Sequence, residues 1–281
     1  MSALEREFGD WRIACLPQDG ARISLLQYKG FDLLTPAPET FRAPQHDYGA
    51  YEERPVYGYD DCFPSVAACR FPGLDWEVPD HGEVCWLPWQ VSEQPDGLLC
   101  QVESKRLPLT LSRRLTFQEN QLEWHFKLEN HGGSPVTVQH VMHPLMPIRA
   151  FTALRLPEFE CAWDDIGAQS LPWITPAEAE AQLLATPEGT TRMWFLQNIK
   201  EGRVTANLVN GMHWIQEWPA ALFPSLALWW NYGAYPDEDG LRRYECALEP
   251  VPGKVSHLEA AGGLTLPANQ SMDWRIKWIL R

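Results

Sequence analysis

The chain has 281 residues, of which 45% are hydrophobic and 21% are charged, a composition typical of a globular protein that buries a sizeable core. Its formal net charge of -14 argues against nucleic acids and anionic membranes as partners, because phosphate groups are bound by clustered lysines and arginines.

The first residues of the chain are charged and contain no apolar leader segment, and no apolar run reaches the roughly 18 residues that a membrane-spanning helix needs. The seven cysteines form no CxxC pair, so neither a zinc site nor a disulfide framework is predicted from their spacing. These features together predict a cytoplasmic protein with reduced thiols and no metal.

Short strands are predicted along the whole chain, because apolar alternation recurs while 24 prolines interrupt longer elements. In chain order, the predicted strands are residues 11–15, 22–26, 98–102, 109–113, 122–128, 136–141, 193–196, 204–209, 226–230, 244–249 and 274–280. The turn around Gly132 and Gly133 predicts that strands 122–128 and 136–141 form a β-hairpin.

One short helix is predicted at residues 175–184, where Thr175 caps the first turn and Pro176 occupies it. No internal repeat or flexible linker divides the sequence. We therefore expect a single all-β domain over residues 1–281, built from antiparallel strands.

Three residues combine proton-transfer chemistry with a rigid setting. Glu249 ends an apolar strand just before Pro250, His81 lies in the turn sequence Pro79-Asp-His-Gly-Glu83, and His143 precedes Pro144. One carboxylate and two imidazoles are sufficient to move protons on and off a neutral substrate.

The order of the motifs resembles that of the galactose mutarotase-like family, the aldose 1-epimerases and their relatives. The resemblance rests on Gly58-Tyr-Asp-Asp-Cys-Phe-Pro64, His81-Gly82, His143-Pro144 and Leu248-Glu-Pro-Val-Pro-Gly253, and it extends over residues 8–281. It implies a large antiparallel β-sandwich, the supersandwich, with a sugar-binding cleft across one concave sheet.

The resemblance also implies roles for these residues: Glu249 as the catalytic base, His143 as the general acid, and His81 as a residue that binds and orients the sugar. The implied reaction is interconversion of α and β anomers by ring opening, with a small-molecule carbohydrate as the partner and no cofactor. His140 and His143 are an odd number of residues apart, so a regular strand sends them to opposite faces, and only one is expected in the cleft.

Further substrate-binding candidates lie around these motifs. Glu245 shares a strand face with Glu249 and is either a second cleft carboxylate or the base itself. Asp60 and Asp61 are two further candidates, although a turn-stabilising role explains them equally well. The remaining candidates are Arg54 and two tryptophans able to stack on a sugar ring, Trp86 and Trp229.

Other interpretations of the same residues remain open. His81 is also compatible with capping a turn through a backbone hydrogen bond, and His143 with a hydrogen-bonded imidazole in the core. The alternative function is a catalytically silent carbohydrate-binding protein of the same fold. A polysaccharide lyase is a third hypothesis, although the chain has no room for the long helical domain that such an enzyme brings.

Overall fold

The computed structural model describes residues 3–37, 56–172, 174–234, 242–258 and 262–281. Within these ranges the chain consists of antiparallel sheets with a single α-helix, which confirms the predicted all-β class. No helix in the described ranges is both long and apolar enough to cross a membrane.

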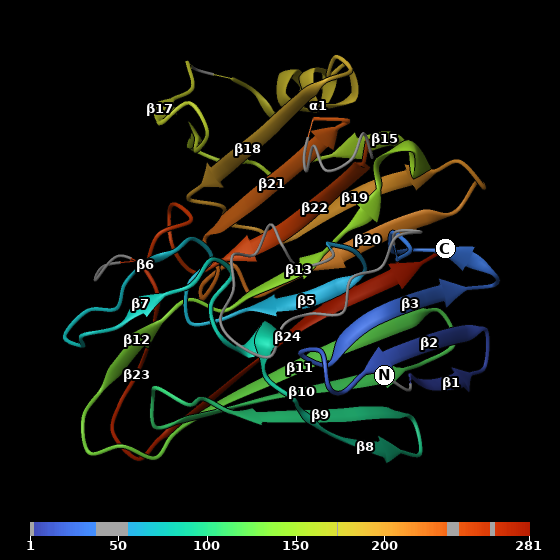
Figure 1. Ribbon diagram of the computed structural model, residues 1–281. Coiled ribbons are helices and arrows are strands. Elements are labelled where there is room, and N and C mark those ends of the chain that lie inside the picture. The colour runs from blue at the N-terminus through green and yellow to red at the C-terminus, as the bar shows by residue number, and fades with distance from the viewer. Residues whose placement is uncertain (1–2, 38–55, 173, 235–241, 259–261) are drawn as a thin grey trace.

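An eight-stranded sheet forms one layer of the structure (Figure 1). In spatial order its strands are β15 (Phe151–Arg155), β19 (Arg203–Leu208), β20 (His213–Glu217), β24 (Ser271–Leu280), β11 (Gln121–Asn130), β10 (Leu109–Phe117), β9 (Gly97–Glu103) and β8 (Gln90–Gln94).

Two six-stranded sheets lie side by side in the layer that faces it (Figure 1). The first contains β1 (Leu4–Phe8), β2 (Trp11–Leu16), β3 (Arg22–Tyr28), β4 (Phe31–Asp32), β5 (Tyr59–Cys62) and β13 (Val141–Pro144). The second contains β14 (Met146–Pro147), β22 (Tyr244–Val251), β21 (Ser225–Tyr232), β18 (Thr190–Gln197), β16 (Cys161–Asp164) and β17 (Gln169–Ser170).

A single short segment joins the two six-stranded sheets. β13 pairs with β5 at the edge of the first sheet, and after Leu145 the chain continues as β14, which pairs with β22 at the edge of the second. β13 and β22 therefore lie next to each other at a seam between the sheets. Two small two-stranded ribbons, β6 (Cys69–Arg70) with β7 (Glu77–Val78) and β12 (Val136–Val138) with β23 (Leu264–Leu266), complete the described strands.

Tryptophans fill much of the space between the layers. In β11 every second residue is buried, which is the two-residue period of a strand with one face on a core. From that face Trp124 contacts Trp278 of β24, whose ring in turn contacts Trp214 of β20, with centroid separations of 5.5 and 5.4 Å. Eleven of the thirteen tryptophans in the described ranges are buried, so these residues serve mainly the core.

The predicted hairpin between residues 122–128 and 136–141 does not form. Both edges of β11 are occupied, by β10 on one side and β24 on the other, while β12 pairs with β23. The Asn130 side chain holds the intervening turn by donating to the carbonyls of Ser134, Leu266 and Pro267. The glycine-containing turn thus carries the chain away from β11 into a separate ribbon.

The predicted helix is present as α1 (Pro176–Leu184). Thr175 caps it, and Glu178 completes a capping box by accepting hydrogen bonds from the backbone N–H and the hydroxyl of Thr175. Local sequence signals were sufficient for this element because its end is stabilised within a few residues.

A buried ion pair ties the two layers together. Asp61 of β5 is paired with Arg113 of β10, and both side chains are fully buried. Asp61 also accepts a hydrogen bond from the Tyr59 hydroxyl at 2.5 Å and contacts His140 Nε2 at 3.0 Å. Burial alone would favour the protonated acid, but Arg113 and His140 outweigh it and hold the pKa of Asp61 below its ordinary value.

Replacing Asp61 by Asn should destabilise the fold strongly. The substitution preserves volume but leaves the buried Arg113 guanidinium without its counter-charge, a change that typically costs about 3–5 kcal/mol. Denaturant-induced unfolding monitored by tryptophan fluorescence measures the loss.

The matched control is Asp96→Asn, which breaks an ion pair with the neighbouring Arg114 on the partly exposed surface. Such a pair contributes about 0–1 kcal/mol. Equal effects of the two substitutions would contradict the role given to the buried pair.

Candidate active site

The candidate site lies at the seam between the two six-stranded sheets. His143 comes from β13, and Glu245 and Glu249 come from β22 across the seam. β5 supports β13 from the other side, with Asp60 directly opposite His143 in the antiparallel register. The seam therefore brings together residues that are far apart in the sequence.

A chain of charges fixes the His143 ring from behind. Its Nδ1 lies 2.8 Å from Asp60 Oδ1, so as an N–H it donates to this carboxylate. Arg22 lies 3.6 Å from the other oxygen of Asp60 and is itself held by Asp19 at 2.8 Å. All four side chains are buried, so the imidazole has a defined orientation with Nε2 directed away from Asp60.

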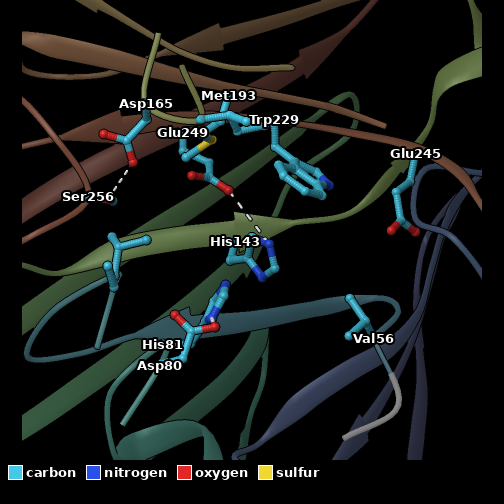
Figure 2. Close-up of a pocket in the computed structure, with 13 residues that line it drawn as sticks. Val56, Asp80, His81, His143, Asp165, Met193, Trp229, Glu245, Glu249 and Ser256 are labelled. Atoms are coloured by element: carbon cyan, nitrogen blue, oxygen red, sulfur yellow. Dashed lines mark hydrogen bonds and ion pairs between the residues drawn. The ribbon is translucent and has the colours of Figure 1, made fainter. Parts of the chain in front are cut away.

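Glu249 faces the other nitrogen of this ring. Its Oε1 lies 3.7 Å from His143 Nε2, as the dashed line in Figure 2 shows. Burial raises the pKa of Glu249 to about 7, and Asp60 adds to the rise while His143 opposes it. The carboxylate is thus tuned to exchange a proton near neutral pH, as a general base at this pH requires.

Glu245 lies in a different electrostatic setting on the same strand. Its Oε2 accepts a hydrogen bond from Arg243 Nε at 2.9 Å. Burial raises the pKa of Glu245, but the Arg243 charge opposes the rise. Figure 2 shows its carboxylate well apart from the His143–Glu249 pair. These contacts favour Glu249 over Glu245 as the base.

His81 approaches the site on a tight turn. The residue has a left-handed backbone conformation with φ 61°, and its N–H donates to the Val66 carbonyl at 2.6 Å. The following Gly82 is required there, since a Cβ atom would collide with the backbone of Phe63 and Pro64. The His81 and His143 rings are consequently only 4.8 Å apart between centroids.

These residues border a cavity of about 240 Å³. Apolar side chains line part of its wall, including Trp229, Met193 and the exposed Ile166. The polar lining residues are Asp80, His81, His143, Asp165, Glu245, Glu249 and Ser256. A mainly apolar wall with a few convergent polar groups is the usual form of a small-molecule site.

The structure brings most of the sequence-predicted site residues to this cavity: Glu249, His143, His81, Glu245 and Trp229 line it. Asp60 lies behind His143 and is not among the described lining residues, so it positions an imidazole instead of meeting a ligand directly. His140 contacts Asp61, away from the cavity, in agreement with the expectation that only one of the two histidines faces the site.

Two residues that were predicted to bind substrate, Asp61 and Trp86, lie where a ligand cannot reach them. Asp61 follows Asp60 on the same strand and therefore points to the opposite face, where Arg113 holds it in the core. Trp86 is buried in a small cluster against which Trp229 packs, and it is absent from the described cavity lining. Arg54 lies outside the described residues.

Sequence reasoning missed several contributors. Arg22 opens a predicted strand, and an arginine at a buried position would have indicated a carboxylate partner. Asp80 precedes His81 and lies 3.1 Å from its Nδ1. Asp165 reaches the cavity wall from the turn after β16, where it accepts a hydrogen bond from Ser256 Oγ at 2.5 Å. No local signal marks that contact, because it joins segments from different parts of the chain.

Comparisons with known proteins identify the fold. No family model and no curated protein matches the sequence. Among solved structures, the chain is similar to the Slr1438 protein of Synechocystis sp. PCC 6803, with a TM-score of 0.75, 16% identity and coverage of 99% of this chain and 95% of that one.

Two further solved structures carry descriptive names. A galactose mutarotase-like protein from Clostridium acetobutylicum has a TM-score of 0.73 at 13% identity and covers 99% of this chain and 95% of its own. A galactose mutarotase-like protein from Lactobacillus casei has a TM-score of 0.71 at 15% identity, with both chains covered completely. The resemblance found in the sequence motifs is thereby confirmed at the level of structure, and the chain has the fold of the galactose mutarotase-like proteins.

Proposed function

We propose that this protein is an aldose 1-epimerase, which interconverts the α and β anomers of a sugar by opening and closing its ring. The observation that carries the proposal is the pair formed by His143 Nε2 and Glu249 Oε1, 3.7 Å apart at the wall of a cavity. An anomeric carbon bears two oxygens, the ring oxygen and the hydroxyl. An acid and a base side by side can serve both at once.

The reaction follows from these two groups. Glu249 removes the proton of the anomeric hydroxyl while the Nε2–H of His143 protonates the ring oxygen. The bond between the anomeric carbon and the ring oxygen breaks, and a carbonyl forms at that carbon. Rotation about the adjacent carbon–carbon bond presents the other face of the carbonyl. Ring closure then reverses both proton transfers, which returns Glu249 to the carboxylate and His143 to its protonated form, ready for the next cycle.

Asp60 supports the acid form of His143. A proton on Nε2 gives the ring a positive charge when Nδ1–H is already donated to Asp60, and the buried carboxylate 2.8 Å away stabilises that charge. Arg22 in turn places a positive charge 3.6 Å from the other carboxylate oxygen of Asp60, which compensates the buried negative charge. Asp60 is therefore a positioning residue that acts through His143.

The cavity supports a sugar as the ligand. Trp229 offers an aromatic surface for the C–H face of a pyranose, while the carboxylates of Asp80, Asp165 and Glu245 are acceptors for hydroxyl groups. Although burial favours its protonated form, the contact with His81 lowers the pKa of Asp80 below its ordinary value. That carboxylate is thus available as an acceptor at neutral pH.

Replacing Glu249 by Gln should abolish catalysis. The amide cannot accept the hydroxyl proton, and the loss of one general base typically lowers a rate by about 10²–10⁴-fold. The measurement is polarimetry or NMR exchange on fresh α-anomers of glucose, galactose and their 6-phosphates, with saturation-transfer NMR to follow sugar binding.

The matched control is Glu245→Gln, on the same strand and at the same cavity. It should retain turnover and alter KM. If Glu245→Gln were inactive and Glu249→Gln active, the base would be Glu245. Sugar binding by the wild-type protein without any acceleration across the panel would instead favour a silent carbohydrate-binding protein.

The pH dependence should report Glu249 directly. As the base works only when deprotonated and burial raises its pKa to about 7, kcat/KM should rise as the pH increases from 5.5 through 7. A glutamate with an ordinary pKa of about 4.3 would already be fully active at pH 6. The profile is measured on EDTA-treated protein, and a flat response from pH 5.5 to 8 would contradict the assignment.

Replacing Asp60 by Asn should lower kcat with little change in KM, since Asp60 acts on His143 from behind the cavity wall. The decrease should not exceed the contribution of one proton-transfer group, about 10²–10⁴-fold. Asp165→Asn, which alters a carboxylate on the cavity wall, should change KM instead. Parallel changes in KM for both variants would mean that Asp60 contacts the sugar.

A further inference from the structure

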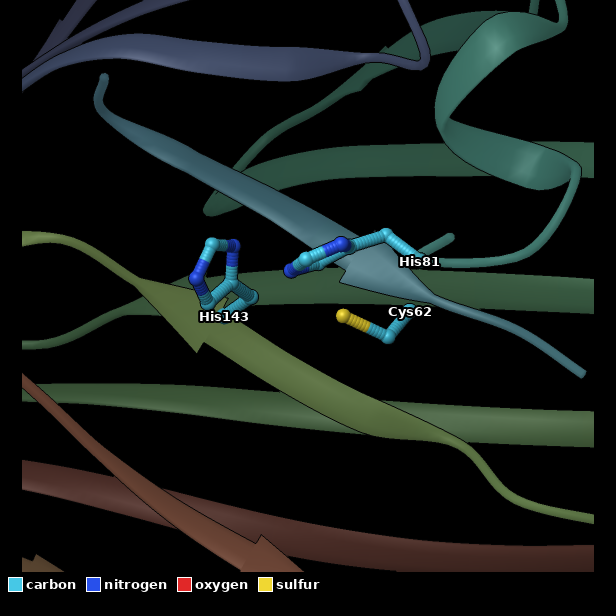
Figure 3. Close-up of side chains that lie close together, drawn as sticks. All are labelled: Cys62, His81 and His143. Carbon is cyan, nitrogen blue, oxygen red and sulfur yellow. The ribbon is translucent and has the colours of Figure 1, made fainter. Parts of the chain in front are cut away.

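A second chemical grouping lies beside the proposed acid and base. Cys62 at the end of β5, His81 in its turn and His143 in β13 each offer a ligand atom, and these atoms lie within 4.8 Å of one another. Figure 3 shows the Cys62 sulfur close to both imidazole rings. The sequence contains no metal-binding spacing that links these three positions, so only the fold reveals the cluster.

The backbone fixes Cys62 on the same side as the active site. Asp60 and Cys62 are two residues apart on β5 and therefore share a face, and in the register with β13 they lie opposite His143 and Val141. A backbone bridge between Phe63 and Gly82 attaches the His81 turn to the end of β5. All three side chains are thus held by regular backbone contacts.

A carboxylate lies beside the Nδ1 atom of each imidazole. His143 Nδ1 is 2.8 Å from Asp60, and His81 Nδ1 is 3.1 Å from Asp80. In metal sites a ligating histidine commonly donates its second ring N–H to a carboxylate, which fixes the tautomer and aims the other nitrogen at the metal. Here the hydrogen bond to Asp60 leaves His143 Nε2 available for a metal, and the ion pair with Asp80 holds the His81 ring beside it.

The surrounding charge also suits a cation. Glu249 lies 3.7 Å from His143 Nε2, and with Asp60 and Asp80 it brings three carboxylates to the cluster. Thiolate and imidazole ligands favour Zn²⁺ and related ions, whereas Mg²⁺ and Ca²⁺ prefer oxygen ligands. The fourth position of a tetrahedral site would fall to Glu249 or water.

We propose that Cys62, His81 and His143 form a binding site for a thiophilic divalent cation of the Zn²⁺ class. The ion lies beside the two histidines that border the cavity and draws its ligands from β5, β13 and the turn between β7 and the short helix at Val84–Trp86.

One consequence rests on the proposed epimerase activity. The metal takes His143 Nε2, which is the atom that protonates the ring oxygen, so a bound ion blocks the general acid. Zinc should therefore inhibit epimerisation, and the inhibition should be relieved by EDTA.

The binding test uses the full chain, freed of metal with EDTA and desalted, and titrated with Co²⁺ as a spectroscopic substitute for Zn²⁺. Co²⁺ bound through Cys62 should give a sulfur-to-cobalt charge-transfer band in the near ultraviolet that Zn²⁺ removes by displacement. Cys62→Ser should abolish the band and weaken Zn²⁺ binding by more than about 10-fold. Cys62→Ala serves as a second variant, with circular dichroism to verify folding.

The matched control is Cys246→Ser, which alters a cysteine that is equally buried but lies on β22, away from the cluster. It should keep the charge-transfer band. Absence of the band in the wild type, or its persistence in both Cys62 variants, would overturn the proposal.

Activity provides a separate readout. For each protein, the epimerisation rate with Zn²⁺ is divided by the rate of the same protein without metal. This ratio should fall below one for the wild type and for Cys246→Ser and remain near one for Cys62→Ser. The cobalt spectrum requires no sugar, so a protein that binds the metal but does not accelerate epimerisation would retain this site and lose the proposed function.

Discussion

Two arginines compensate the charges of adjacent buried carboxylates on β5, and these ion pairs hold the structure together around that strand. Asp60 and Asp61 point to opposite faces of β5, and each meets its own guanidinium: Arg22 on the side of the cavity and Arg113 between the layers. Removing a carboxylate from water is strongly unfavourable unless a counter-charge and hydrogen bonds replace the solvent. The two arginines allow β5 to carry both acids, of which one links the sheets and the other orients the imidazole of His143.

The same physical rule explains why Glu249 differs from its acidic neighbours. Asp61 and Glu249 are similarly buried, yet the pKa of Asp61 is lowered by Arg113 while that of Glu249 rises to about 7. Glu249 has His143 beside it, and among the described residues no lysine or arginine is paired with it. The surroundings of each acid thus favour the charged form of Asp61 and raise the pKa of Glu249 into the range where it can exchange a proton near neutral pH.

Sequence reasoning recovered the parts of this arrangement that depend on local patterns. Alternation predicted most of the long strands, Thr175 and Pro176 predicted α1, and strand parity separated His140 from His143. It failed where strand pairing is decided by distant segments. The turn at Gly132 looked like a hairpin because nothing in residues 122–141 reveals that β24, at the far end of the chain, occupies that edge of β11. For the same reason parity could divide Asp60 from Asp61 but could not show which of them meets His143.

The opposed carboxylates also constrain how β5 can pair. This strand has only four residues, too few for hydrophobic contacts alone to select one alignment with β13 firmly. A slip by one position would turn every side chain of β5 to the other face. Asp61 would turn away from Arg113, whose buried guanidinium would lose its counter-charge, and Asp60 would lose its contact with Arg22. Tyr59 and Cys62 would also move to the opposite faces of the strand. Electrostatic mismatch therefore excludes the neighbouring alignments, so that the two ion pairs fix the register of a strand of only four residues.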